Sequence, residues 1–208
     1  MEPLTAEDRR RRNRQQARRA IIDATEALML EGDGDDFSIR RVATRCGYSA
    51  PTIYHYFGDK DGLIDALLEE RFGELARLVR ERKSGADPAE DLREVARTYV
   101  EFGVRNPSVY RLLMNTRGGT QRRVAAAEEA QGTVQRLLGS LAADGRLLTR
   151  NVETAQHATL GLLVGLIALR IQRPDAACSE DVNRAAIELL LRGIISDPAR
   201  SPNVPANR

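Results

Sequence analysis

The stretch "SIRRVATRCGYSAPTIYHYF", residues 38–57, contains the pattern that identifies the fold of this chain. Ser38 and Ser49 each precede a short helical pattern, and a serine side chain can accept a hydrogen bond from the first turn of a helix. Gly47 lies where the first helix must end, because glycine adopts the positive φ of a sharp turn without a Cβ clash. Two short helices joined by a tight turn predict a helix-turn-helix.

The second of these helices has an apolar side and a polar side. Ile53 and Phe57 are four residues apart and are expected to face the protein core. Hydroxyl, imidazole and phenol groups lie on the other side, and such groups can reach base edges, thymine methyls and phosphate oxygens in a major groove about 12 Å wide. The outward residues of this predicted recognition helix are Ser49, Thr52, His55 and Tyr56.

The whole chain is predicted to be all-α, with about nine helices. Apolar residues recur at steps of three and four, and no run has the alternation of a strand. An Asp-Pro pair at 87–88, an Asn-Pro-Ser run at 106–108 and Ser179 mark helix starts. The expected spans are 7–31, 38–45, 49–56, 59–83, 88–105, 108–115, 119–144, 151–172 and 179–196.

Helix length changes abruptly near residue 60, which predicts two domains. A flexible basic arm is expected at 1–13, followed by a three-helix helix-turn-helix domain at 14–62. A larger helical domain is expected at 63–196. Residues 197–208 are rich in proline and polar residues and are expected to be disordered.

Charge is distributed unevenly along the 208 residues, although the formal net charge is only +2. Residues 9–19, "RRRRNRQQARR", hold seven arginines and no acid, whereas "EGDGDD" at 31–36 holds four acids. We expect some of Arg9 to Arg14 to contact DNA phosphates or a minor groove, a solvated tail being the alternative. Arg18 and Arg19 can equally form the polar face of the first helix.

Several classes of protein are disfavoured by the composition. Cys46 and Cys178 are too few for a disulfide framework or a zinc site, and the acidic stretch lacks the spacing of a calcium loop, so no metal or cofactor is expected. The longest apolar run, 160–169, is about half a membrane span, and no secretory signal precedes it; a cytoplasmic protein is expected. Two histidines, with no nucleophile elbow or phosphate loop, argue against an enzyme.

A known family shares these motifs. The run from Arg18 through Ile21, Ala24 and Leu28, followed by "FSIRRVATRCGYSAPTIYHYFGDKDGLIDAL", resembles the DNA-binding domain of the TetR (tetracycline repressor) family of bacterial transcriptional regulators. The resemblance covers roughly residues 14–68. It implies an all-α homodimer in which two such domains bind operator DNA and a C-terminal domain binds an inducer.

The same resemblance implies roles for individual residues. Ser38 is expected to cap the first helix of the motif and meet a phosphate, while Arg40 extends toward a base. Lys60 is expected to hold a phosphate at the start of the fourth helix. The recognition helix is entered through Ser49, Ala50 and Pro51, and its contact surface is formed by Thr52, Tyr54, His55 and Tyr56.

The predicted helix at 151–172 is apolar nearly all round, so one core cannot cover it. Gly161 and Gly165, one turn apart, allow another helix to come close. Together with the helix at 179–196 it is expected to form a four-helix interface between two subunits, burial within one subunit being the alternative. One stripe contains Leu160, Leu163, Val164, Ile167 and Ile171, and the other contains Leu162, Leu166 and Leu169.

The segment "YVEFGVRNPSVYRLLMNTRGG", residues 99–119, is aromatic-rich around an Asn-Pro break. It resembles the regulatory half of one subgroup of the family, which has a WHG-type C-terminal domain. These side chains can be core, or they can line an apolar ligand cavity where helices diverge. The residues named for such a cavity are Tyr99, Phe102, Tyr110, Met114 and His157.

The function predicted from the sequence is that of a ligand-responsive repressor that binds a palindromic operator as a homodimer. The alternative is an architectural or interaction dimer that binds DNA without small-molecule control. The presence of a sizeable pocket discriminates between them.

Overall fold

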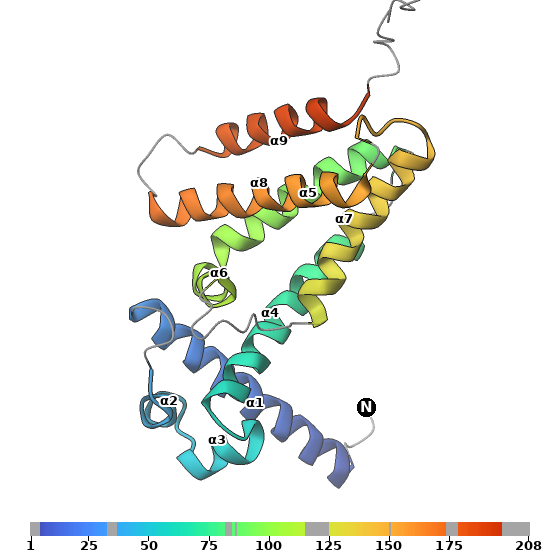
Figure 1. Cartoon of the computed structure of the whole chain (residues 1–208). Coiled ribbons are helices and arrows are strands. Elements are labelled where there is room, and N and C mark those ends of the chain that lie inside the picture. Colours follow the sequence, from blue (N-terminus) through green and yellow to red (C-terminus); the bar gives the residue numbers. More distant parts are fainter. Residues whose placement is uncertain are drawn as a thin grey trace, which may run out of the picture. The chain divides into compact units, whose positions relative to one another are not determined.

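The computed structural model describes residues 5–32, 37–81, 85, 87–114, 125–149, 151–173 and 179–196, without the side chains of 113 and 114. Over these residues the chain forms nine helices and no named strand (Figure 1), so the all-α prediction is confirmed. The helices are α1 (Ala6–Glu31), α2 (Ile39–Cys46), α3 (Ala50–Phe57), α4 (Lys60–Glu81), α5 (Pro88–Arg105), α6 (Pro107–Met114), α7 (Ala125–Ala143), α8 (Val152–Gln172) and α9 (Glu180–Ile194).

The helix bounds agree closely with the expected spans, apart from the end of the last helix. That helix ends at Ile194, and Ile195 forms an isolated antiparallel bridge with Leu147. The Leu148 N–H donates to the Ile194 carbonyl at 2.8 Å, and the Ser196 N–H donates to the Arg146 carbonyl at 2.7 Å. These bonds satisfy backbone groups that a longer helix would have used internally. The parts of the expected spans at 82–83, 115 and 119–124, and the expected tail, lie outside the described residues.

The start of α1 lies within the segment that the sequence analysis assigns to a flexible arm. Thr5 Oγ1 accepts a hydrogen bond from the Asp8 N–H at 3.1 Å, and the Asp8 carboxylate accepts one from the Thr5 N–H at 3.3 Å. This reciprocal capping box starts the helix at Ala6. Residues 6–13 are therefore helical, and the arginines at 9–12 lie exposed on a continuous helix.

The chain divides into two compact units, and the division falls inside α4, between Arg71 and Phe72. The expected domain boundary at 62 falls inside the same helix. The first unit contains residues 1–71 and 106–124, so α6 belongs to it and packs against α1. The second unit contains residues 72–105 and 125–208.

The first unit has a core of aliphatic side chains from α1, α3 and α4. Ile21, Ile53 and Leu67 are fully buried there. Arg71 on α4 reaches back to α1, with its guanidinium 2.6 Å from the Glu26 carboxylate and 3.0 Å from the Asp23 carboxylate. These contacts attach α4 to α1 and give the short helices α2 and α3 a framework to pack on.

In the second unit, α5 packs against α7, α8 and α9, and α8 and α9 run beside each other (Figure 1). Gly103 on α5 lies directly against Ile167 on α8. A Cβ added to Gly103 would lie 2.5 Å from Cδ1 and 2.8 Å from Cγ1 of Ile167. A methyl group at this position would therefore force the buried Ile167 side chain or the helices themselves to shift.

We expect Gly103→Ala to lower the free energy of unfolding by about 1–3 kcal/mol, since the new methyl overpacks a closed contact. Gly132→Ala on α7 is the matched control, because no described atom lies within 4 Å of its added Cβ. That control should gain up to about 1 kcal/mol from helix propensity. Chemical denaturation measures both, and a Gly103→Ala protein as stable as the wild type would contradict the packing described.

Candidate DNA-binding surface and effector site

Local hydrogen bonds define both ends of α2. Ser38 Oγ accepts from the Arg41 N–H at 3.3 Å, as expected for an N-terminal cap. Gly47 follows the helix with φ of 74°, and its N–H donates to the Ala43 carbonyl at 3.0 Å. A residue with a Cβ is strained in this left-handed conformation, so glycine allows the sharp turn toward α3.

A second cap starts α3 and orients its two sides. Ser49 Oγ accepts from the Thr52 N–H at 3.2 Å. Ile53 and Phe57 are buried, whereas Tyr54 is 49% exposed and His55 is exposed beside it. Burial of two side chains one turn apart holds the helix on the core. The polar side of α3 consequently remains available to another molecule.

Two cations lie on aromatic rings around α3. The Arg18 guanidinium on α1 is 4.9 Å from the centre of the Phe57 ring. The Lys60 ammonium, at the start of α4, is 4.6 Å from the centre of the Phe37 ring. Such cation–π contacts position each charge on the rigid unit.

All ten residues predicted to contact DNA lie in the first unit, and none of them is buried. Ser38 and Arg40 are exposed at the start of α2, and Lys60 is half-buried at the start of α4. Arg41 is also exposed, next to Arg40. It was not predicted as a contact residue, because the sequence alone does not distinguish two adjacent arginines. The remaining seven predicted contact residues are Ser49, Ala50, Pro51, Thr52, Tyr54, His55 and Tyr56.

The five residues named for a ligand cavity do not lie in one unit. Tyr99 and Phe102 are buried in the second unit, where the Phe102 ring lies 6.1 Å from that of Phe72. Burial raises the pKa of Tyr99, although its hydrogen bond with Gln131 opposes this shift.

The remaining three are dispersed. Tyr110 is buried in the first unit, and the side chain of Met114 lies outside the described residues. His157 is exposed on α8, with Nδ1 2.8 Å from the Glu153 carbonyl oxygen. The assignment of these five residues to a ligand site therefore stays a prediction.

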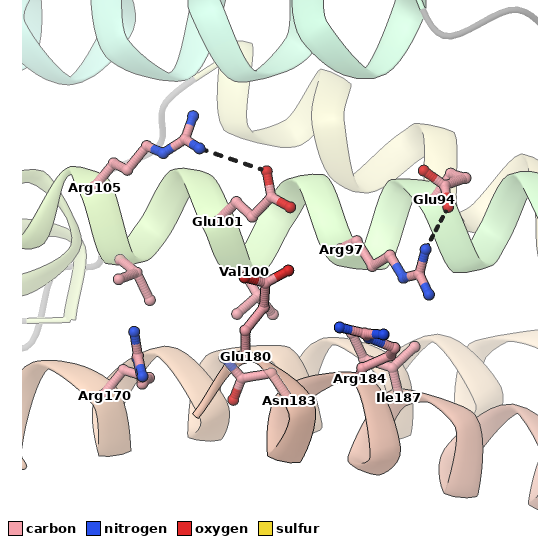
Figure 2. A pocket seen from close by; sticks show the side chains of 11 residues that line it. Glu94, Arg97, Val100, Glu101, Arg105, Arg170, Glu180, Asn183, Arg184 and Ile187 are labelled. Atoms are coloured by element: carbon pink, nitrogen blue, oxygen red, sulfur yellow. Dashed lines mark hydrogen bonds and ion pairs between the residues drawn. The ribbon is translucent and has the colours of Figure 1, made fainter. Parts of the chain in front are cut away.

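A groove of about 550 Å³ lies in the second unit between α5, α8 and α9 (Figure 2). Its lining is rich in charge, unlike the apolar cavity expected from the sequence. The groove could not be recognised from the sequence, because its residues are spread over three helices and resemble ordinary surface ion pairs. The lining residues are Glu94, Arg97, Val100, Glu101, Val104, Arg105, Arg170, Glu180, Asn183, Arg184 and Ile187.

Two further features bear on the kinds of site present. Within the described ranges, no group of three or more His, Cys, Asp or Glu side chains could hold a metal ion. In the same ranges one helix, α8, is long and apolar enough to cross a membrane by length and composition alone. Helices at the core or interface of other proteins meet the same criterion.

A capped helix-turn-helix on an all-α scaffold defines a DNA-binding transcriptional regulator. Residues 21–67 match the family described as "Bacterial regulatory proteins, tetR family". Residues 92–194 match the family described as "Tetracyclin repressor-like, C-terminal domain". The chain belongs to the TetR family, which confirms the resemblance found in the sequence.

Solved structures share the fold at low sequence identity. The regulator FadR from Bacillus subtilis, in complex with stearoyl-CoA, is 18% identical with a TM-score of 0.72, covering 84% of this chain and 98% of that chain. RolR in complex with resorcinol is 20% identical with a TM-score of 0.61, covering 90% and 92%. A TetR-family regulator from Pectobacterium atrosepticum is 22% identical with a TM-score of 0.67, covering 90% and 98%.

We expect Arg40→Ala and Lys60→Ala to weaken DNA binding in different ways. Arg40→Ala should cost about 1–3 kcal/mol and relax the preference at one operator position, because alanine is too short to reach a base. Lys60→Ala should weaken binding to all DNA sequences alike. It should also reduce the slope of log affinity against log salt concentration by about one unit. Binding to an operator library at several salt concentrations measures both.

Arg77→Ala is the control, since Arg77 is an exposed arginine in the second unit that pairs with Glu81. It should leave operator binding unchanged. The reverse pattern for the two test variants would show that the base and phosphate contacts are assigned to the wrong residues.

Proposed function

We propose that this protein is a ligand-responsive repressor that binds a palindromic operator as a homodimer. The exposed polar side of α3, held on the core through Ile53 and Phe57, is the observation that carries the proposal. In this proposal Thr52, Tyr54 and His55 contact base edges and phosphates. Arg40 contacts a base, and Lys60 contacts the DNA backbone. A two-fold dimer presents two such helices to the two half-sites of a palindrome.

The exposed face shared by α8 and α9 supports a subunit interface. In the most apolar 18-residue stretch of α8, only 28% of the residues are buried within one chain. Leu169 is 45% exposed, and on α9 Val182 and Leu189 are 42% and 71% exposed. Large apolar side chains gathered on neighbouring helices favour burial against a second copy.

Both apolar stripes seen in the sequence of α8 contribute to the core of their own unit. Leu163 and Ile167 of one stripe are fully buried, and Leu166 of the other stripe is buried as well. Gly161 and Gly165 lie outside this core, and among the described residues no atom lies within 4 Å of a Cβ added to either. These glycines leave space for a partner helix to approach closely.

Control by a small molecule is supported by relatives and by the groove. FadR and RolR have this fold and were solved with stearoyl-CoA and resorcinol respectively. A groove of about 550 Å³ favours a ligand-responsive regulator over the alternative of a DNA-binding interaction dimer without such control. An effector releases the operator only if it binds more tightly to the arrangement of the dimer that does not fit DNA.

The proposed function is tested by sequencing genomic fragments retained by the purified protein. Retained fragments should share one inverted repeat upstream of a few genes. Retention without any shared motif would favour an architectural DNA-binding role instead.

We expect Leu189→Glu to give monomers that bind the operator weakly. A carboxylate buried without a partner costs several kcal/mol, which corresponds to a loss of about 100-fold or more in dimer affinity. Light scattering measures the mass and fluorescence anisotropy measures operator binding. Leu30→Glu is the matched control, because Leu30 is a 57% exposed leucine on α1, in the other unit. A Leu189→Glu protein that remains dimeric would place the interface elsewhere.

We expect replacement of Arg9, Arg10, Arg11 and Arg12 by glutamine to weaken operator binding more at low salt than at high salt. Each phosphate that is no longer neutralised should reduce the salt slope by about 0.9. Glutamine forms helices well, so circular dichroism should show that α1 is retained. An equal loss at all salt concentrations would exclude a mainly electrostatic role for these arginines.

A further inference from the structure

We propose that the groove between α5 and α9 binds a hydroxyl-bearing organic anion, such as a sugar phosphate or a sugar acid. Its role as an effector rests on the proposed function, whereas the binding itself does not. The groove lies wholly within the second unit, so its geometry is independent of the DNA-binding surface.

Two guanidinium groups provide the anion site. Arg97 on α5 and Arg184 on α9 project into the groove from its two opposite walls (Figure 2). Arg97 pairs with Glu94 at 2.9 Å and Arg184 pairs with Asp181 at 3.1 Å, each on its own helix. A guanidinium has five N–H donors, so both groups keep donors for an anion placed between them. Facing arginines suit the planar or tetrahedral oxygens of a carboxylate or phosphate.

A buried amide indicates that the ligand also carries a hydrogen-bond donor. Asn183 lines the groove, is only 9% exposed, and its Oδ1 has no hydrogen-bond partner in the described part of the chain. Buried polar atoms in native proteins nearly always have a partner, which water or a ligand supplies where protein does not. Because this oxygen is itself enclosed, a rotation of the Asn183 side chain would present it to a hydroxyl group of the ligand.

The rest of the groove fits the same class of compound. The Glu180 carboxylate points across the groove toward α5 (Figure 2) and accepts hydrogen bonds but donates none. Val100 and Ile187 are buried and line the groove, where they can pack against a carbon skeleton. Hydrogen-bond acceptors next to the two arginines favour anions that carry hydroxyl groups over anions that carry none.

Solvated ion pairs are the alternative explanation for the charges. Exposed pairs at i,i+3 spacing contribute little and need no ligand. They do not account for a buried amide oxygen without a partner, however. Adventitious binding of any small anion to the arginines is a third possibility, which the experiment separates from the proposal.

The test is isothermal titration calorimetry of the full chain with glucose 6-phosphate, glucuronate, glucose and inorganic phosphate. We expect one of the two anionic sugars, or both, to bind saturably in the millimolar range or tighter, and glucose not to bind. Tighter binding of glucose 6-phosphate would identify a phosphate ligand, and tighter binding of glucuronate a carboxylate ligand.

Variants assign the binding to the groove. The double variant Arg97→Gln, Arg184→Gln should lose about tenfold or more in affinity for the anionic sugars. Asn183→Leu should lower the affinity for the anionic sugars by about tenfold, because these ligands offer a hydroxyl group to Asn183. The affinity for inorganic phosphate should not change. Arg77→Gln removes an exposed arginine elsewhere in the same unit and should change nothing.

Three outcomes would overturn the proposal. They are unchanged affinity in the double variant, binding of inorganic phosphate as tight as that of the sugars, and no saturable binding by either anionic sugar. Thermal unfolding of each variant should match that of the wild type. If the Asn183→Leu protein does not fold, Asn183→Asp is used in its place. The added negative charge should lower the affinity for both anionic sugars.

Operator binding is measured in parallel so that the two proposals can fail separately. Without sugar, the double variant should bind operator DNA like the wild type. Operator binding without sugar binding would refute only the anion site. Sugar binding by a protein that binds no operator would refute only the proposed function.

Discussion

Burial of Ile53 and Phe57 holds the DNA-binding unit together. An eight-residue helix is too short to be stable alone in water, so α3 exists because its apolar side is covered. The same burial leaves Tyr54 and His55 exposed on the other side. Stability and recognition are therefore two consequences of one helix orientation, with Arg18 on the Phe57 ring adding a further contact.

The second unit is organised around close packing at Gly103. Where α5 and α8 pack at Gly103, Ile167 and the neighbouring Leu163 are buried, whereas Leu169 near the end of α8 is 45% exposed. That exposed surface, continued by Leu189 on α9, is the one on which the proposed dimer rests.

Charged residues have different consequences in the two units. In the first, Arg71 joins α4 to α1 through Glu26 and Asp23, and its ion pairs are partly shielded from water. In the second, Arg97 and Arg184 each pair along their own helix, and both line the groove. The first arrangement is structural, whereas the second suits a ligand.

The helices, the helix-turn-helix and its family could all be predicted from the sequence alone. Caps such as Ser38 and Ser49 and the turn at Gly47 depend on hydrogen bonds and dihedral angles within a few residues, so they can be recognised locally. The three-dimensional arrangement was needed to establish that Leu163 is core, that Tyr99 and Tyr110 belong to different units, and that Arg97 and Arg184 share a groove. Those facts depend on how helices pack, and periodicity along one helix does not specify which neighbour covers each side.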